Sequence, residues 1–264
     1  MTGNPDGMWV TESVPELSGG VSSSKVGIRE RLWLTILAFA FYIVGYFSLN
    51  RWFPSTESHT VATAIDTSLP LMPSWVYVYV FVYFVAFLPM AVVANQRLFQ
   101  RGVIAYLAAQ FTCFVVFYTY PVEMALRQEP DATDTFAQWG LLVVHWIDGP
   151  GTCLPSLHVT AATMGALLCW KADRLTSILA LMAAALIGIS TLLVKQHYIV
   201  DVVLGFAVAF FWYRLLVYPV DLNGIPTEEL RLPRWCSLLL LAFYGCVLAG
   251  FYIAYLNQWE PWLN

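Results

Sequence analysis

Long apolar stretches separated by short polar segments dominate the chain. Those at about 32–49, 76–94, 102–120, 154–170, 176–195, 198–219 and 235–256 approach the roughly 20 residues with which a helix crosses a bilayer. The fourth stretch is short, and Gly149, Pro150, Gly151 and Pro155 precede it, which predicts a non-helical entry. The pattern therefore predicts an all-α polytopic membrane protein with a six-helix core and a seventh, C-terminal span.

The segments between these stretches complete the predicted organisation. Residues 1–27 are rich in Gly, Ser, Pro and acidic residues, which predicts a disordered cytoplasmic tail. Residues 28–220 then form one transmembrane domain, and 221–264 form a cytoplasmic linker and the extra span. The longest segment on the outer side, 121–154, ends in the apolar sequence FAQWGLLVVHWID, which is too short to cross. We interpret it as an interfacial or re-entrant helix above the outer ends of the spans.

Composition excludes several classes of protein. Hydrophobic residues make up 59% of the chain and charged residues 11%, whereas soluble domains carry about 25% charged residues. The net charge of −4 gives no basic surface for a nucleic acid. The five cysteines have no CxxC spacing, so they predict neither a disulfide framework nor a zinc site.

The basic residues predict the orientation in the membrane. With the N-terminus in the cytoplasm, only three of the thirteen Lys and Arg residues lie outside: Arg51, Arg127 and Lys195. The other ten are on the cytoplasmic side: Lys25, Arg29, Arg31, Arg97, Arg101, Lys171, Arg174, Arg214, Arg231 and Arg234. All four histidines then lie on the outer, non-cytoplasmic side.

Two polar clusters at the outer ends of spans carry the candidate chemistry. His197 and Asp201 are four residues apart, so on a helix they share one face. An aspartate inside a span is costly unless it is partnered, and a His–Asp hydrogen bond would also orient the imidazole. A purely structural polar pair is the alternative. The second cluster is Pro155-Ser156-Leu157-His158, a pattern that taken alone favours a structural helix start.

Together these clusters resemble two signatures of the type 2 phosphatidic acid phosphatase superfamily. Residues 155–158, PSLH, are similar to the second signature. Residues 190–201, STLLVKQHYIVD, are similar to the third, SRxxxxxHxxxD, with the same Ser, His and Asp spacing. The PSLH and HYxxD variants resemble the branch that contains inositol phosphorylceramide synthase and related lipid phosphotransferases.

The chain departs from the family at its phosphate-binding cations. The first signature, KxxxxxxRP, corresponds best to residues 120–128, YPVEMALRQ, in which Arg127 matches the Arg but Tyr120 and Gln128 replace the Lys and Pro. Thr191 replaces the Arg of the third signature. Lys195, two residues before His197, is the candidate substitute for a missing cation.

The resemblance implies a membrane lipid phosphatase or lipid headgroup phosphotransferase. His197, held by Asp201, would attack phosphorus to form a phosphohistidine, and His158 would act as general acid and then as base. Ser156, Arg127 and Lys195 would bind the phosphate, and no metal or other cofactor is expected. The implied substrate is a membrane phospholipid or prenyl phosphate at the outer leaflet, with water or a lipid hydroxyl as acceptor.

Three alternatives remain open at this stage. A transporter could use Asp201, Lys195 and the histidines to relay protons, although it should show midplane breaks and internal repeats. A catalytically inactive family member could only bind lipid. A metal site could join His145 and Asp148 to His158 and His197, although these residues lack a recognisable ligand spacing.

Overall fold

The computed structural model describes residues 24–52, 57–130 and 132–263, which form helices and no strand. Six helical stretches are long and apolar enough to cross a membrane: Ile28–Asn50, Pro73–Val92, Gln96–Thr119, Arg174–Leu193, Ile199–Val217 and Trp235–Leu256. The all-α polytopic prediction is confirmed, and the chain is an integral membrane protein. The predicted disordered tail lies almost entirely outside the described residues.

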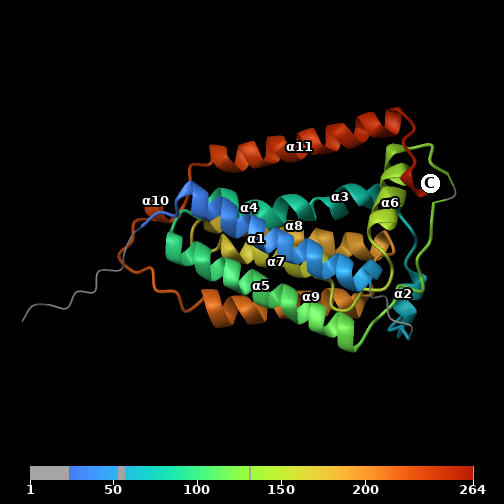
Figure 1. The fold of residues 1–264 in the computed structure, drawn as a ribbon, viewed down its shortest axis with the longest axis horizontal. Helices are drawn as coiled ribbons and strands as arrows, with labels where there is room; N and C mark the ends of the chain where they lie inside the picture. Colours follow the sequence, from blue (N-terminus) through green and yellow to red (C-terminus); the bar gives the residue numbers. More distant parts are fainter. Residues whose placement is uncertain (1–23, 53–56, 131, 264) are drawn as a thin grey trace, which may run out of the picture.

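Most of these helices run side by side in one bundle (Figure 1). Its members are α1 (Ile28–Phe47), α4 (Val82–Val92), α5 (Gln96–Thr119), α7 (Leu157–Leu168), α8 (Arg174–Leu193) and α9 (Ile199–Trp212). The short α3 (Val76–Val80) leads into α4, and five-residue π-helical segments follow α1 and α9.

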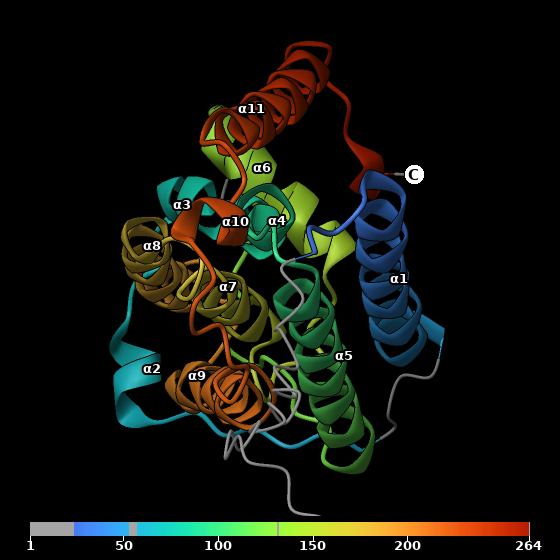
Figure 2. The same ribbon diagram turned by 90° about the vertical axis from the view of Figure 1, so that its left-hand side faces the viewer.

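The fourth predicted span differs from the others. It is α7, a helix of 12 residues, every one of which is buried. It lies at the centre of the bundle and packs against α4, α5, α8 and α9 (Figure 2). The helix is shorter than the predicted 154–170 because it begins only after Pro155 and gives way to turns after Leu168. A Cβ on Gly165 would lie 2.3 Å from the carbonyl oxygen of Val85, so this glycine permits the close packing of α7 on α4.

Different short helices lie at the two ends of the bundle. At one end, which we name the α6 end, lie α2 (Ala64–Ser68) and α6 (Phe136–Ile147), and α6 lies across the long helices (Figure 1). Helix α6 is the short apolar helix predicted within 121–154; Thr135 and Gln138 close its N-terminus with a capping box. At the opposite, α10 end lies α10 (Thr227–Leu230).

The last helix, α11 (Trp235–Leu256), lies along the outside of the bundle. It contacts α4 and α6, and none of its residues is buried. It is apolar along its whole length, which is typical of a helix whose surface faces lipid. The predicted C-terminal span is therefore present, as an addition to the bundle.

Candidate active site

His158 lies in the first turn of α7 because Ser156 ends the non-helical entry and caps the helix. The Ser156 hydroxyl oxygen accepts the Val159 backbone N–H at 3.3 Å. The Ser156 N–H donates to the Asp201 carbonyl oxygen at 2.9 Å, which ties the start of α7 to the start of α9. Gly205 permits this approach, since a Cβ there would lie 2.7 Å from the Ser156 carbonyl oxygen.

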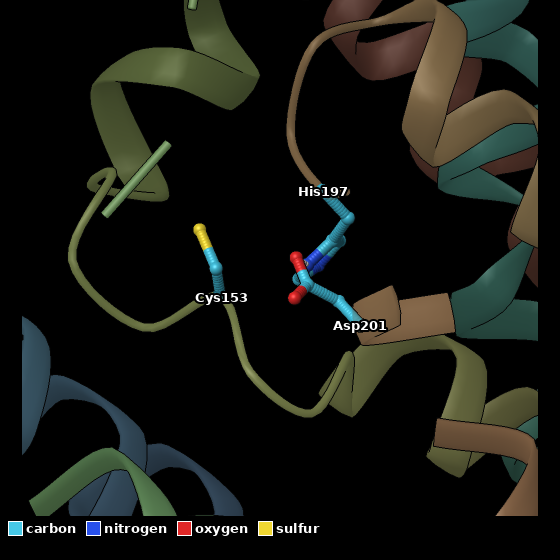
Figure 3. Close-up of side chains that lie close together, drawn as sticks. All are labelled: Cys153, His197 and Asp201. Atoms are coloured by element: carbon cyan, nitrogen blue, oxygen red, sulfur yellow. Dashed lines mark hydrogen bonds and ion pairs between the residues drawn. The ribbon is translucent and has the colours of Figure 1, made fainter. Parts of the chain in front are cut away.

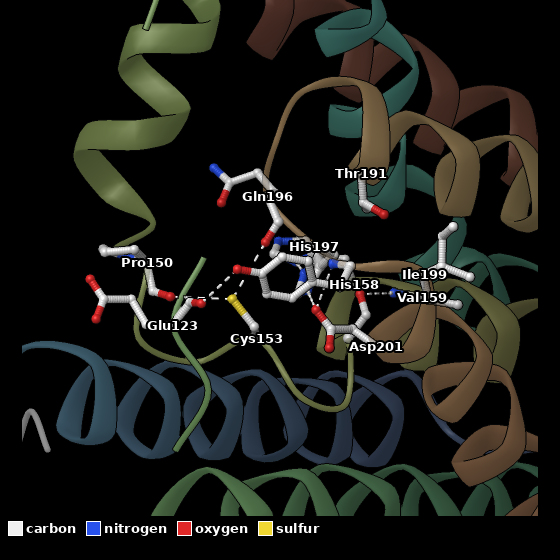
Figure 4. Close-up of polar contacts among 12 residues, drawn as sticks. Glu123, Pro150, Cys153, His158, Val159, Thr191, Gln196, His197, Ile199 and Asp201 are labelled. Carbon is white, nitrogen blue, oxygen red and sulfur yellow. Dashed lines mark hydrogen bonds and ion pairs between the residues drawn. The ribbon is translucent and has the colours of Figure 1, made fainter. Parts of the chain in front are cut away.

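His197 lies in the tight connection between α8 and α9. The backbone N–H groups of Gln196 and His197 both donate to the Thr191 carbonyl oxygen, at 2.9 and 3.2 Å, and turn the chain back over the end of α8. Asp201 follows in the first turn of α9, where its Oδ2 accepts the Tyr198 N–H at 2.8 Å. The two signature regions, far apart in sequence, therefore meet at the α6 end (Figure 4).

The three predicted catalytic side chains form a continuous line. His197 Nδ1 lies 3.4 Å from Asp201 Oδ2, and His197 Nε2 lies 3.4 Å from His158 Nδ1. Asp201 is completely buried, and each histidine is 5% exposed. Burial of a carboxylate beside two imidazoles keeps water from screening their interaction.

The line continues beyond His158 to Tyr79, which sequence reasoning missed, and to Asp148, which the sequence placed near His158 only in the metal-site alternative. The Tyr79 hydroxyl donates to Asp148 Oδ2 at 2.7 Å, and its oxygen lies 2.9 Å from His158 Nε2. Asp148 Oδ2 itself is 3.5 Å from His158 Nε2. Burial raises the pKa of Asp148 to about 8, so this carboxyl exchanges its proton close to neutral pH. Each histidine thus has a carboxyl group on the side that faces away from the other.

The predicted phosphate-binding cations lie at the same end but contact other groups. The Arg127 guanidinium donates to the side-chain oxygen of Gln196, next to His197, and to the His145 carbonyl oxygen at 3.5 Å. Within the part of the chain that the structure describes, no acceptor contacts its Nε. Lys195 has a left-handed backbone, with φ of 56°, and its Nζ donates to the carbonyl oxygens of Asp66 and Leu69. Neither cation contacts the two histidines, so a direct role toward phosphate stays a prediction for both.

Helix α2 supports the site through Asp66, which sequence reasoning missed. Its Oδ1 accepts the backbone N–H of Ile199, the first residue of α9, at 2.9 Å. Hydrogen bonds from Thr63 and from Ile199 hold the pKa of Asp66 below its usual value, although burial opposes them. The segment Thr63-Ala64-Ile65-Asp66 has the pattern of a capping box, and that signal could have identified Asp66 as a structured carboxylate.

Cys153 also lies in the site. Its sulfur lies beside His197 and Asp201, with one ligand atom from each residue within 4.8 Å of the others (Figure 3). This is the only such group among the described residues, and it differs from the metal alternative built on His145 and Asp148. The thiol donates to the carbonyl oxygens of Pro150 and Gln196 (Figure 4), and burial raises its pKa, so at neutral pH Cys153 is a protonated thiol.

A family comparison agrees with this arrangement. The model of the PAP2 superfamily, the type 2 phosphatidic acid phosphatases, matches residues 47–215, which include both signature regions. The chain belongs to the PAP2 superfamily. No match is found among the curated proteins. Membership in PAP2 indicates a membrane enzyme of the lipid phosphatase or phosphotransferase type, while the inositol phosphorylceramide synthase-like branch stays a prediction.

Proposed function

We propose that this PAP2 protein cleaves or transfers a lipid phosphate through a phosphohistidine on His197. The observation that carries the proposal is the line Asp201–His197–His158, with 3.4 Å between Nε2 of His197 and Nδ1 of His158. In this proposal Asp201 accepts a hydrogen bond from the Nδ1–H of His197, which leaves the unprotonated Nε2 to attack phosphorus. His158 protonates the leaving oxygen through Nδ1 and then removes a proton from water or a lipid hydroxyl.

The proton inventory of the line supports these roles. When Asp148 is ionised, the Tyr79 hydroxyl donates its hydrogen bond to Asp148 and its oxygen accepts one from Nε2 of His158, so we assign a proton to that nitrogen. We likewise assign a proton to Nδ1 of His197, which faces Asp201. The two facing nitrogens then share a single proton. When it resides on His158, the pair consists of one acid and one nucleophile, as the first half-reaction requires.

Substrate binding must separate the two rings. A phosphorus atom ready for attack lies about 3–3.5 Å from the nucleophile, and the leaving oxygen lies roughly 2.8 Å from its proton donor. Both cannot fit within a 3.4 Å gap between the nitrogens. We infer that the phosphate enters between His197 and His158, with Ser156, the free N–H groups that begin α7, Arg127 and Lys195 as its candidate contacts.

An apolar groove supports a lipid substrate. It runs between α1, α4, α5 and α7, and its wall includes Phe39, Tyr83 and Phe87. His158 and Leu157 form part of the same wall, so a hydrocarbon chain in the groove has its polar end beside the catalytic pair. Phe39 and Tyr83 are partly exposed on the outer surface of the bundle, which gives the groove an opening toward lipid.

The activity is tested on purified protein with a panel of phospholipids, lipid phosphates and prenyl phosphates. We expect phosphate release, or transfer of radiolabel to a lipid hydroxyl, in the presence of excess EDTA. In the proposal, protein cations and helix N–H groups bind the phosphate oxygens in place of a metal ion. Vanadate should inhibit, because it mimics five-coordinate phosphorus. No release or transfer with any member of the panel, or activity that requires added zinc or magnesium, would refute the proposal.

The proposal places the site on the non-cytoplasmic side of the membrane. The background has Cys236 and Cys246 replaced by serine. Ala125→Cys lies beside the site, where the Ala125 N–H donates to the Tyr198 hydroxyl, and Asn223→Cys lies four residues before α10. In intact cells, an impermeant thiol reagent should label the cysteine at 125 and leave the one at 223 unlabelled. The reverse pattern would place the site on the cytoplasmic side.

A further inference from the structure

Cys153, His197 and Asp201 bring three metal-ligating side chains together from different parts of the fold. Cys153 lies in the connection between α6 and α7, His197 in that between α8 and α9, and Asp201 in the first turn of α9. One ligand atom of each lies within 4.8 Å of the others, and the Asp201 carboxylate points toward Cys153 (Figure 3). The thiol has no part in the proposed phosphoryl transfer, although it lies beside the proposed nucleophile.

One oxygen of the Asp201 carboxylate is left without a hydrogen bond. Its Oδ2 accepts the Tyr198 N–H and faces Nδ1 of His197, whereas Oδ1 has no hydrogen-bond partner among the described residues. Asp201 is completely buried. A buried carboxylate oxygen without a partner is costly, and a water or an ion is what satisfies such an atom. The thiol and the imidazole beside this oxygen favour a metal ion.

The types of ligand atom select the metal. Zn²⁺ takes Cys sulfur at about 2.3 Å and His nitrogen or carboxylate oxygen at about 2.0–2.2 Å. Tetrahedral bonds of these lengths put neighbouring ligand atoms roughly 3.3–3.6 Å apart, so small side-chain movements would complete the geometry. Mg²⁺ instead demands octahedral oxygen ligands. One thiolate and one carboxylate also neutralise the two charges of Zn²⁺, which lowers the cost of burying the ion.

We propose that Zn²⁺ binds to Cys153, His197 and Asp201 and thereby inhibits the enzyme; the inhibition rests on the proposed function. As the Zn–S bond forms, the thiol proton leaves to solvent, and Asp201 binds as its carboxylate. A neutral imidazole has one unprotonated nitrogen, and the metal takes its lone pair. His197 then has no lone pair for phosphorus, whichever of its two nitrogens faces the ion.

Metal binding is measured first, because it does not depend on turnover. The parent protein for this experiment has Cys236 and Cys246 replaced by serine, since neither cysteine is buried and both could bind metal. Titration with Zn²⁺ alone should give one site per chain. Co²⁺ in its place should produce the charge-transfer absorption of a thiolate–cobalt bond. Absence of either signal would overturn the inference.

The same protein reports inhibition. Phosphate release should fall in proportion to the fraction of sites filled with Zn²⁺ and should return when EDTA is added. Mg²⁺ at the same concentrations should not inhibit, because the cluster offers it one carboxylate and no octahedral set of oxygens.

Cys153→Ser is the decisive variant. A serine hydroxyl can still donate to the carbonyl oxygens of Pro150 and Gln196, as the thiol does. The variant should lose the cobalt charge-transfer band and weaken Zn²⁺ binding by at least about 100-fold, since even groups that only orient metal ligands change affinity 10- to 100-fold. Its phosphate release, compared with its own rate without metal, should resist Zn²⁺. Inhibition that persists in Cys153→Ser would overturn the inference.

Two control variants make the result specific to this cluster. Cys113→Ser replaces another buried cysteine of the bundle and should bind Zn²⁺ as the parent does. Asp148→Asn should also keep the affinity for Zn²⁺, because Asp148 is not a member of the cluster. Loss of binding in Asp148→Asn with retention in Cys153→Ser would place the metal at the His145 and Asp148 alternative.

Binding and turnover together separate this inference from the proposed function. If Zn²⁺ binds through Cys153 and no lipid phosphate is cleaved, the metal site stands and the phosphatase proposal falls. If lipid phosphates are cleaved and Zn²⁺ does not bind through Cys153, the reverse holds. Binding through Cys153 that leaves phosphate release unchanged would refute the inhibition.

Discussion

The Tyr79 hydroxyl lies 2.9 Å from Nε2 of His158 and at the same time donates to Asp148 at 2.7 Å. Tyr79 is completely buried, and its contacts join α3 to α7 and to the C-terminus of α6. In the proposed mechanism this hydroxyl accepts a hydrogen bond from Nε2 of His158 and so fixes which nitrogen of His158 carries a proton. It makes Tyr79 a positioning residue for the proposed acid–base group.

Replacement of this tyrosine tests that role. Tyr79→Phe removes the hydrogen bond and retains the ring, so kcat should fall by about 10- to 100-fold, a part of what a general acid contributes. KM should change little, and the pH profile of kcat should shift because the proton of His158 is no longer held. Tyr77→Phe, whose ring is half exposed on the same helix, is the matched control and should retain full activity. Equal effects of the two substitutions would contradict the assignment.

Asp148, the other partner of Tyr79, should make the stability of the folded protein depend on pH. Its pKa is raised from 3.8 to about 8, so between these values the folded protein keeps a proton that the unfolded chain releases. The stability of the folded protein therefore falls as pH rises through this window. Asp148→Asn can still accept from Tyr79 but does not ionise. Relative to the unaltered protein, its free energy of unfolding should increase by on the order of 4 kcal/mol between pH 5 and pH 8.

Thermal unfolding in detergent across this pH range measures the difference, and the same samples report activity. Asp148→Asn should be slower than the unaltered protein even where it is more stable, because the network around Tyr79 and His158 loses a carboxyl group that exchanges its proton close to neutral pH. A stability difference that does not change with pH would show that Asp148 ionises as freely in the folded protein as in the unfolded chain.

Leaving groups distinguish the two histidines. His197→Ala should abolish both half-reactions for every substrate, because it lacks the nucleophile. His158→Ala should lose about 10²–10⁴ in rate with a lipid alkoxide leaving group and much less with nitrophenyl phosphate, whose leaving group needs no proton. With nitrophenyl phosphate it should accumulate phosphohistidine, since the second step still needs a base. Rapid quench detects this acid-labile, base-stable phosphate, and its persistence in His197→Ala would identify another nucleophile.

Substitution of Arg127 and of Lys195 should affect different properties of the protein, activity alone in the first case and both activity and stability in the second. Arg127→Met should lower kcat/KM by roughly 2–5 kcal/mol in transition-state binding if the guanidinium meets a desolvated phosphate, with little change in thermal stability. Lys195→Met removes two hydrogen bonds that hold α2, so it should lower the unfolding temperature as well as the activity. A Lys195 variant that is normally stable but inactive would favour direct contact with phosphate. An active Arg127 variant would exclude that residue from phosphate binding.

The sequence identifies the spans and the meeting of His158 with His197 and Asp201 because both rest on short-range patterns. Apolar length predicts helices, and two short signatures at span ends predict side chains at one level. Tyr79 gives no such signal, since a tyrosine within an apolar stretch looks like any membrane aromatic until the fold brings Asp148 to it. Lys195 shows the opposite error, because it lies two residues from His197 in sequence but its side chain points to α2. Its backbone is left-handed, and its Nζ donates to the carbonyl oxygen of Asp66 in α2. Sequence spacing predicts neither the Tyr79–Asp148 contact nor this direction of the Lys195 side chain.

The short central helix has a consequence for how the protein is made. Twelve residues of α7 span about 18 Å, whereas the hydrocarbon core of a bilayer is roughly 30 Å thick. All of them are enclosed by neighbours, and two of those neighbours, α8 and α9, are synthesised after α7. During translation the segment with His158 therefore packs on α4 and α5 but lacks α8 and α9 until Asp201 has also entered the membrane. Helices α8 and α9 complete the packing around α7 after it has been synthesised. His158 and His197 therefore meet only when biogenesis of the bundle is nearly complete.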